Sequence, residues 1–347
     1  CYIITYLLSR RVNDSPYHVD LMTNCRLART LRTFGFGMSF AGAVVLAEVP
    51  QVATDIPPVH SLVSQVMGEM GEPDLIVSPG ASPHGFAMRP SQARALQTAD
   101  IVFQIGHGLT PWLEHALEAL AKDTVVITLS KSLGTLKHRF RSGPDFDPPK
   151  DEDTHQSGHR HATTDHSTQH AEHGDQNIDP HMWLDPENAR RWLDTIAVEL
   201  SELDPENTAR YRLNAQTRSA DLANLTATLA STLSPVADQP FLVLHDAFHY
   251  FEHRFEIEAT GAISPGDAAS PGPARITRIR DTIRERNITC VFTEPQLRSS
   301  LVTAVIEGSP AKSRILDPLG SSLRPGPDLY PQLLQNLADS LVDCLGR

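Results

Sequence analysis

The sequence predicts an α/β protein of two similar lobes with parallel-type sheets, joined by one long rigid helix. Short apolar runs bounded by Gly, Pro and polar residues recur in both halves of the chain and alternate with helix-like segments. Residues 209–234 carry Tyr and Leu at mostly helical spacing without an internal Gly or Pro. Two lobes joined in this way leave a cleft between the carboxyl ends of their strands, where open α/β sheets bind ligands.

The apolar runs place the expected elements. In the first half we expect strands near residues 51–55, 74–78, 101–105 and 124–129. A helix over residues 90–99 follows the second run, because Pro90 suits a first helical position. In the second half we expect strands near residues 241–245, 256–260, 289–293 and 314–317. The expected domains are an N-terminal lobe over 48–208, a linking helix over 209–234 and a C-terminal lobe over 235–347.

Charge limits the classes of partner. The 347 residues carry a formal net charge of -12, so nucleic acid and anionic membrane surfaces are poor partners. We expect no nucleic-acid partner, and we expect a monomer.

Residues 1–47 have the composition of a leader. Arg26, Arg29 and Arg32 form a basic region, residues 34–46 are apolar and small, and Val45-Leu46-Ala47 offers the small residues that signal peptidase requires. We expect cleavage before Glu48 and export to the periplasm. The alternative is a short membrane anchor, but the apolar run is shorter than the ~20 residues that a spanning helix needs.

Two cysteines, Cys290 and Cys344, remain in the expected mature chain. In an exported protein they most simply form a disulfide. Two separate buried thiols are the alternative.

A histidine-rich segment at 151–174 belongs to neither lobe. It is acidic, has almost no apolar residues and cannot contribute to a core, so we expect a mobile loop. Imidazole and carboxylate are ligands for zinc, copper and nickel, which predicts weak, multi-site metal binding. The alternative is a polar insertion without function. The six histidines are His155, His159, His161, His166, His170 and His173.

Four further residues lie at expected strand ends or turns. His84 follows the second apolar run, His181 stands before a helix in "DPHMWLDPENA", His245 ends "FLVLH", and Asp317 ends "RILD". Each alone could be an ordinary polar residue at a strand end. Three imidazoles and one carboxylate brought to one cleft, however, suit tetrahedral zinc.

Three other histidines are weaker candidates. His249 and His253 are spaced from His245 by four and eight residues, which a continuous helix would align on one face. Because His245 should end a strand, that helical phase breaks, and we expect His249 and His253 to be surface residues. For His60 we expect a role at the start of a helix.

Five ordered motifs now reveal a resemblance. "SPHGFAMRPSQARALQTADIV", "DPHMWLDPENA", "HDAFHYFEHRF", "CVFTEPQ" and "LDPLG", with a His-rich acidic loop before the second, resemble the periplasmic zinc-binding proteins of bacterial ABC zinc uptake systems. The resemblance covers about residue 50 to the end. It implies two α/β lobes joined by one long helix, zinc held between them and delivered to a membrane permease, and a disulfide matching Cys290 and Cys344.

The family's three histidines fall on His84, His181 and His245. Manganese-binding relatives have a carboxylate at the position of His245, and the softer imidazole favours zinc. Asp317 matches their fourth ligand. Some zinc-binding members instead use a glutamate directly before the first histidine, where this chain has Pro83. The fourth ligand is therefore Asp317 or water, and we favour Asp317 slightly.

The residues alone leave two other classes of function as alternatives. A secreted zinc hydrolase also uses three protein ligands and a water, although no HExxH helix is present. Glu294, at the end of a strand in "FTEPQ", would be its candidate general base. A metal-regulated adhesin or a zinc buffer is the third possibility.

Overall fold

The computed structural model describes residues 49–143, 145–146, 177–264 and 271–346. The expected leader over 1–47 and the histidine-rich loop over 151–174 lie outside these residues.

The first lobe is a parallel sheet covered by helices. Its strand order is β2-β1-β3-β4, and every pair of neighbouring strands is parallel. Pro at the first position begins each of its helices, where the missing N–H costs no hydrogen bond. The elements are β1 (Val52–Thr54), α1 (Pro57–Met67), β2 (Asp74–Leu75), α2 (Pro90–Thr98), β3 (Ile101–Gln104), α3 (Pro111–Leu120) and β4 (Val125–Thr128).

The second lobe repeats this topology. Its strand order is β6-β5-β7-β8, again with parallel neighbours. The elements are β5 (Phe241–Val243), α6 (His249–Phe255), β6 (Gly261–Ala262), α7 (Pro273–Glu285), β7 (Cys290–Thr293), α8 (Ser300–Ile306), β8 (Lys312–Ile315) and α9 (Leu329–Leu345).

One expected strand is wrong. Residues 256–260 do not form a strand, because Glu256 takes a left-handed conformation (φ 54°) that ends α6, and the chain must leave the helix before it can pair. The strand begins only at Gly261. The last strand also lies slightly earlier than expected, over Lys312–Ile315.

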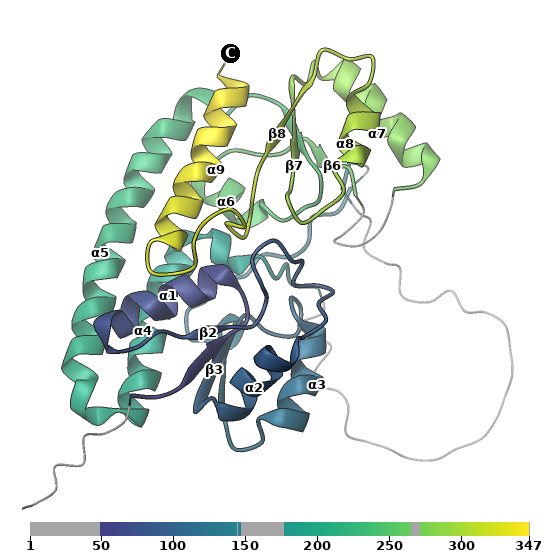
Figure 1. Ribbon diagram of the computed structural model, residues 1–347. Helices are drawn as coiled ribbons and strands as arrows, with labels where there is room; N and C mark the ends of the chain where they lie inside the picture. Colours follow the sequence, from purple (N-terminus) through teal and green to yellow (C-terminus); the bar gives the residue numbers. More distant parts are fainter. Residues whose placement is uncertain (1–48, 144, 147–176, 265–270, 347) are drawn as a thin grey trace, which may run out of the picture. The chain divides into compact units, whose positions relative to one another are not determined.

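Two long helices connect the lobes. α4 (Pro186–Leu203) is followed by α5 (Thr208–Leu233), and α5 packs against α1, α4 and α9 (Figure 1). One buried apolar cluster includes Ile56 and Trp192 together with Phe241 and Tyr330, so it joins elements of both halves. The predicted fold class, two α/β lobes with a long connecting helix, is confirmed.

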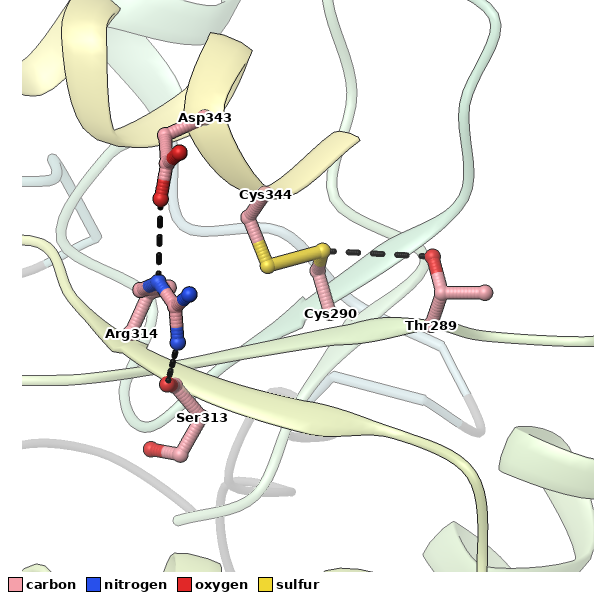
Figure 2. The surroundings of a disulfide bond; sticks show 6 residues. All are labelled: Thr289, Cys290, Ser313, Arg314, Asp343 and Cys344. Carbon is pink, nitrogen blue, oxygen red and sulfur yellow. Dashed lines mark hydrogen bonds and ion pairs between the residues drawn. A yellow bond between two sulfur atoms is a disulfide. The ribbon is translucent and has the colours of Figure 1, made fainter. Parts of the chain in front are cut away.

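A disulfide ties the last helix to the second sheet. Cys290 begins β7 and bonds to Cys344 near the end of α9 (Figure 2). Beside it, the Arg314 guanidinium of β8 donates to the Asp343 carboxylate of α9 at 3.1 Å. Closing a loop of this length in the unfolded chain stabilises the fold by about 4 kcal/mol in the chain-entropy account.

Among the helices of the described residues, none combines the length and the apolar character that crossing a membrane requires.

Candidate metal site

His84 lies in the turn segment that connects β2 to α2. The Trp112 indole N–H on α3 donates to the Pro83 carbonyl at 2.7 Å, and the Phe86 ring lies 5.4 Å from that of Trp112. These contacts on either side of the histidine fix a segment that has no regular secondary structure. His84 itself is half-buried.

His181 is oriented by the aspartate two residues before it. Both its backbone N–H and its ring Nδ1 lie against Asp179 Oδ1, at 2.9 and 2.7 Å. Because a carboxylate only accepts, we assign the ring proton to Nδ1, which leaves the lone pair on Nε2. His181 is 2% exposed and stands directly before a short 3₁₀ turn (Met182–Leu184) that leads into α4.

His245 has the same arrangement in the second lobe. It lies two residues beyond β5, and its Nδ1 is 2.6 Å from Glu294 Oε1. Glu294 follows β7 directly and is buried. The carboxylate again places the proton on Nδ1 and the lone pair on Nε2.

The three histidines meet at one point. The Nε2 atoms of His181 and His245 are 3.4 Å apart, and each of the three histidines offers a nitrogen within 4.8 Å of the other two. Zinc binds imidazole nitrogen at about 2.0–2.1 Å, so two nitrogens of a tetrahedral site lie about 3.3 Å apart. The two buried histidines are therefore already spaced for one ion. The pocket around them is lined by Pro83, Trp183 and Gln296, among others.

Asp317 is near this pocket but not part of the histidine group. Its carboxylate oxygens accept hydrogen bonds from the backbone N–H groups of residues 319–321 and from the side chains of Gln296 and Ser321. Five donors on one carboxylate hold the loop after β8 in place. A metal ligand at this position would have to give up some of these bonds.

Other sequence candidates have different surroundings. His60 is a buried residue of α1, and its ring Nε2 lies 2.9 Å from the Pro73 carbonyl oxygen, which is a structural contact. His253 is exposed as expected, whereas the side chain of His249 is only 20% exposed. His249 was predicted to be a surface residue, but helix α6 turns it toward Asp179. The six loop histidines, His155 to His173, lie outside the described residues.

The two carboxylates that contact His181 and His245 were not predicted in this role. Glu294 was a candidate general base, yet its carboxylate contacts His245. Asp179 was not singled out, although its place two residues before His181 was a usable signal, because such an Asp can accept from the backbone that follows it. The contact between His245 and Glu294 joins separate strands and has no local signal.

A family model described as zinc-uptake complex component A, periplasmic, matches residues 52–344. The chain belongs to this family. Family relatives include the high-affinity zinc uptake system protein ZnuA of Brucella suis biovar 1, which is 40% identical over 328 residues covering 90% of this chain and 96% of the relative. ZnuA of Paracoccus denitrificans is also 40% identical, over 86% of this chain and 93% of its own.

Solved structures agree on the fold of the ZnuA family. A crystal structure of ZnuA, 24% identical, aligns with a TM-score of 0.69 and covers 86% of this chain and 99% of that one. The solute-binding protein FpvC of Pseudomonas aeruginosa in complex with Mn²⁺, 21% identical, aligns with a TM-score of 0.68 and covers 86% and 99%. Membership of a family of zinc-uptake components indicates a transport protein and not a hydrolase.

Proposed function

We propose that this chain captures Zn²⁺ between its two lobes through His84, His181 and His245. The observation that carries the proposal is the convergence of three imidazole nitrogens within 4.8 Å of one another. Two of the rings have a carboxylate behind them, at Asp179 and Glu294, which is the arrangement that fixes the tautomer of a zinc-bound histidine and raises its basicity.

The donor set favours zinc, copper and nickel over magnesium, calcium and manganese. Magnesium, calcium and manganese prefer oxygen ligands, whereas imidazole suits zinc, copper and nickel. Two of the histidines are buried with their ring orientation fixed, so little ordering remains to be done when the ion binds. This favours tight binding of zinc, which the relatives' description as high-affinity zinc uptake proteins supports.

We propose water as the fourth ligand. The alternative from the sequence, Asp317, stays a prediction, but its carboxylate already accepts five hydrogen bonds. Three protein ligands and one open position leave the ion accessible. An open position suits a carrier that must release its cargo.

The partner of such a carrier is the membrane permease of an ABC zinc transporter. We propose that the chain works in the periplasm as a monomer, after removal of residues 1–47. An N-terminal lobe over 48–208 and a C-terminal lobe over 235–347 would be joined by a linking helix over 209–234. The Cys290–Cys344 disulfide suits an oxidising compartment.

Metal analysis of the protein purified without added zinc tests the proposal. We expect one tightly held zinc per chain, and uptake in cells under zinc limitation that depends on both this chain and the permease. A tightly bound metal other than zinc would contradict the proposed cargo, and uptake that continues without the chain would contradict the transport role.

A further inference from the structure

A second group of histidines lies close to the first. His249 and His253 stand one turn apart on α6, and His138 comes from the segment after β4. The ring of His138 lies 5.0 Å from that of His249 and 4.4 Å from that of His253, between centroids. The His138 ring therefore contacts both of the others, tilted by 42° to the His249 ring and by 41° to the His253 ring.

The position of His138 is fixed by its backbone. Its N–H donates to the Tyr250 hydroxyl at 2.8 Å, and that hydroxyl donates to the Asp179 carbonyl at 2.9 Å. The Asp179 N–H in turn donates to the His138 carbonyl at 3.0 Å. These hydrogen bonds hold His138 against α6. They also connect it to Asp179, whose carboxylate contacts His181 of the first histidine group.

Asp179 stands between the two histidine groups. Its Oδ1 accepts from His181, while its Oδ2 is buried without a hydrogen-bond partner among the described residues. The buried Nδ1 of His249 is equally unpartnered there and lies 3.9 Å from this Oδ2. A small movement of the His249 side chain would let its Nδ1–H donate to Asp179 Oδ2, as the Nδ1–H of His181 donates to Oδ1. The Nε2 lone pair of His249 would then be available to a metal.

We propose that His138, His249 and His253 form a second, weaker zinc site. It is separate from the pocket of His84, His181 and His245, and it uses the other oxygen of the same aspartate. Three imidazoles, two of them on one face of a helix, are a donor set that zinc accepts.

The second site should be weaker because it is only partly assembled. Among the described residues, only His84, His181 and His245 place three ligand atoms within 4.8 Å of one another. Zinc binding at the second group therefore requires side chains to move, and the exposed His253 is the least restrained of the three. Ordering an exposed side chain costs conformational entropy, which the two buried histidines of the first site have largely lost on folding.

The pKa values of the two half-buried members, His138 and His249, agree with this role. Burial lowers the pKa of both His138 and His249, and His253 and Arg141 respectively add to this effect. Asp179 acts in the opposite direction on both rings. A lowered pKa keeps imidazole neutral at neutral pH, which is the state that binds a metal.

Crystals of the full chain soaked in zinc chloride, with diffraction measured at the zinc edge, test the site directly. We expect a strong anomalous peak at His84, His181 and His245 and a second, weaker peak between His138, His249 and His253. Occupancy of the first position alone at millimolar zinc would mean that the three rings only pack against one another, and the proposal would be overturned.

Histidine-ring NMR of the full chain in solution gives an affinity for this position alone. Once one equivalent of zinc chloride has filled the first site, further zinc should shift the rings of His138 and His249. His253→Ala should weaken this second response at least about tenfold, since one of three ligands is lost. The matched control is His115→Ala, which removes another exposed histidine, on α3.

The comparison of the two variants decides the outcome. An unchanged response of His138 and His249 in His253→Ala would overturn the proposal. Equal weakening in His115→Ala would overturn it too, because the effect would then be nonspecific. Because His253 is exposed and its ring lies against His138, outside the first histidine group, the tight zinc should be retained in both variants, which also shows that they are folded.

Discussion

The two histidine groups differ in how much of their geometry is set by the fold. In the first, His181 and His245 are buried, each against a carboxylate at 2.6–2.7 Å, and their Nε2 atoms are 3.4 Å apart. In the second, His249 is 3.9 Å from its carboxylate and His253 is exposed. Residue type is the same in both groups. The carboxylates and the burial, and not the number of histidines, set the expected difference in affinity.

The largest effect is expected from removing the first group. We call the one tightly bound zinc ion the strong class of zinc. It should disappear in a variant with His84, His181 and His245 all changed to Ala, because no other described residues offer an assembled set of three ligands. Competitive chelator titration measures this. The control is the triple Ala variant of His138, His249 and His253, which should keep the strong class. A strong class that survives in the first variant would show that the ligands are elsewhere.

The second largest effect is expected from acid, which should lower the affinity for the tightly bound zinc. Each ligating imidazole must lose a proton, and free imidazole titrates near ~6.5. With three such ligands, affinity should fall by roughly a hundredfold or more between pH 7 and 5. Zinc titration against a chelator of known pH dependence measures it. A flat profile would mean that carboxylates alone hold the metal.

The supporting carboxylates should matter less than the ligands. Glu294→Gln and Asp179→Asn should each weaken the strong class by about 10–100-fold, because a carboxylate that hydrogen-bonds to a metal-binding histidine and orients its ring typically contributes this much. Asp179 faces His181 and His249, whereas Glu294 contacts His245, so Asp179→Asn should also weaken the response of His249 and Glu294→Gln should not. Equal effects of both variants on His249 would contradict a shared aspartate.

The same contrast explains what the sequence could predict. Apolar runs bounded by Gly and Pro located the sheet strands other than β6, because a buried parallel strand needs a continuous apolar segment. His84, His181 and His245 were found because they follow such runs or precede a helix. The partner of His245 was not assigned, since Glu294 is 49 residues away and meets it only when β5 and β7 pair.

The errors in the prediction have similar physical causes. The strand expected over 256–260 fails because Glu256 ends α6 in a left-handed conformation, which no apolar pattern encodes. His249 was assigned to the surface because the phase from His245 is broken. His245 indeed lies outside α6, so the two residues do not share one helix face. However, α6 begins at His249, and the helix directs this side chain toward Asp179. Tertiary contacts, and not local pattern, decide such side chains.

A smaller effect is expected at Asp317. If water is the fourth ligand, Asp317→Asn should weaken zinc by less than tenfold, below ~1.4 kcal/mol, because the three imidazoles are untouched. The amide oxygen can still accept some of the loop's hydrogen bonds. Chelator competition measures the loss, with Asp343→Asn near the disulfide as a control. A loss above tenfold in Asp317→Asn alone would make Asp317 the fourth ligand.

The smallest effect on the strong class is expected from deleting residues 151–174. The strong site depends on histidines held by the lobes, so it should keep its affinity, while weak zinc binding by His155, His159, His161, His166, His170 and His173 should be lost. Calorimetry of the deletion variant measures both classes. Anomalous diffraction at the zinc edge then distinguishes loop zinc from zinc at the second histidine group. The peak between His138, His249 and His253 should persist in the deletion variant. Loss of the strong class would instead show that a loop histidine is a true ligand and that His84, His181 and His245 are an incomplete set.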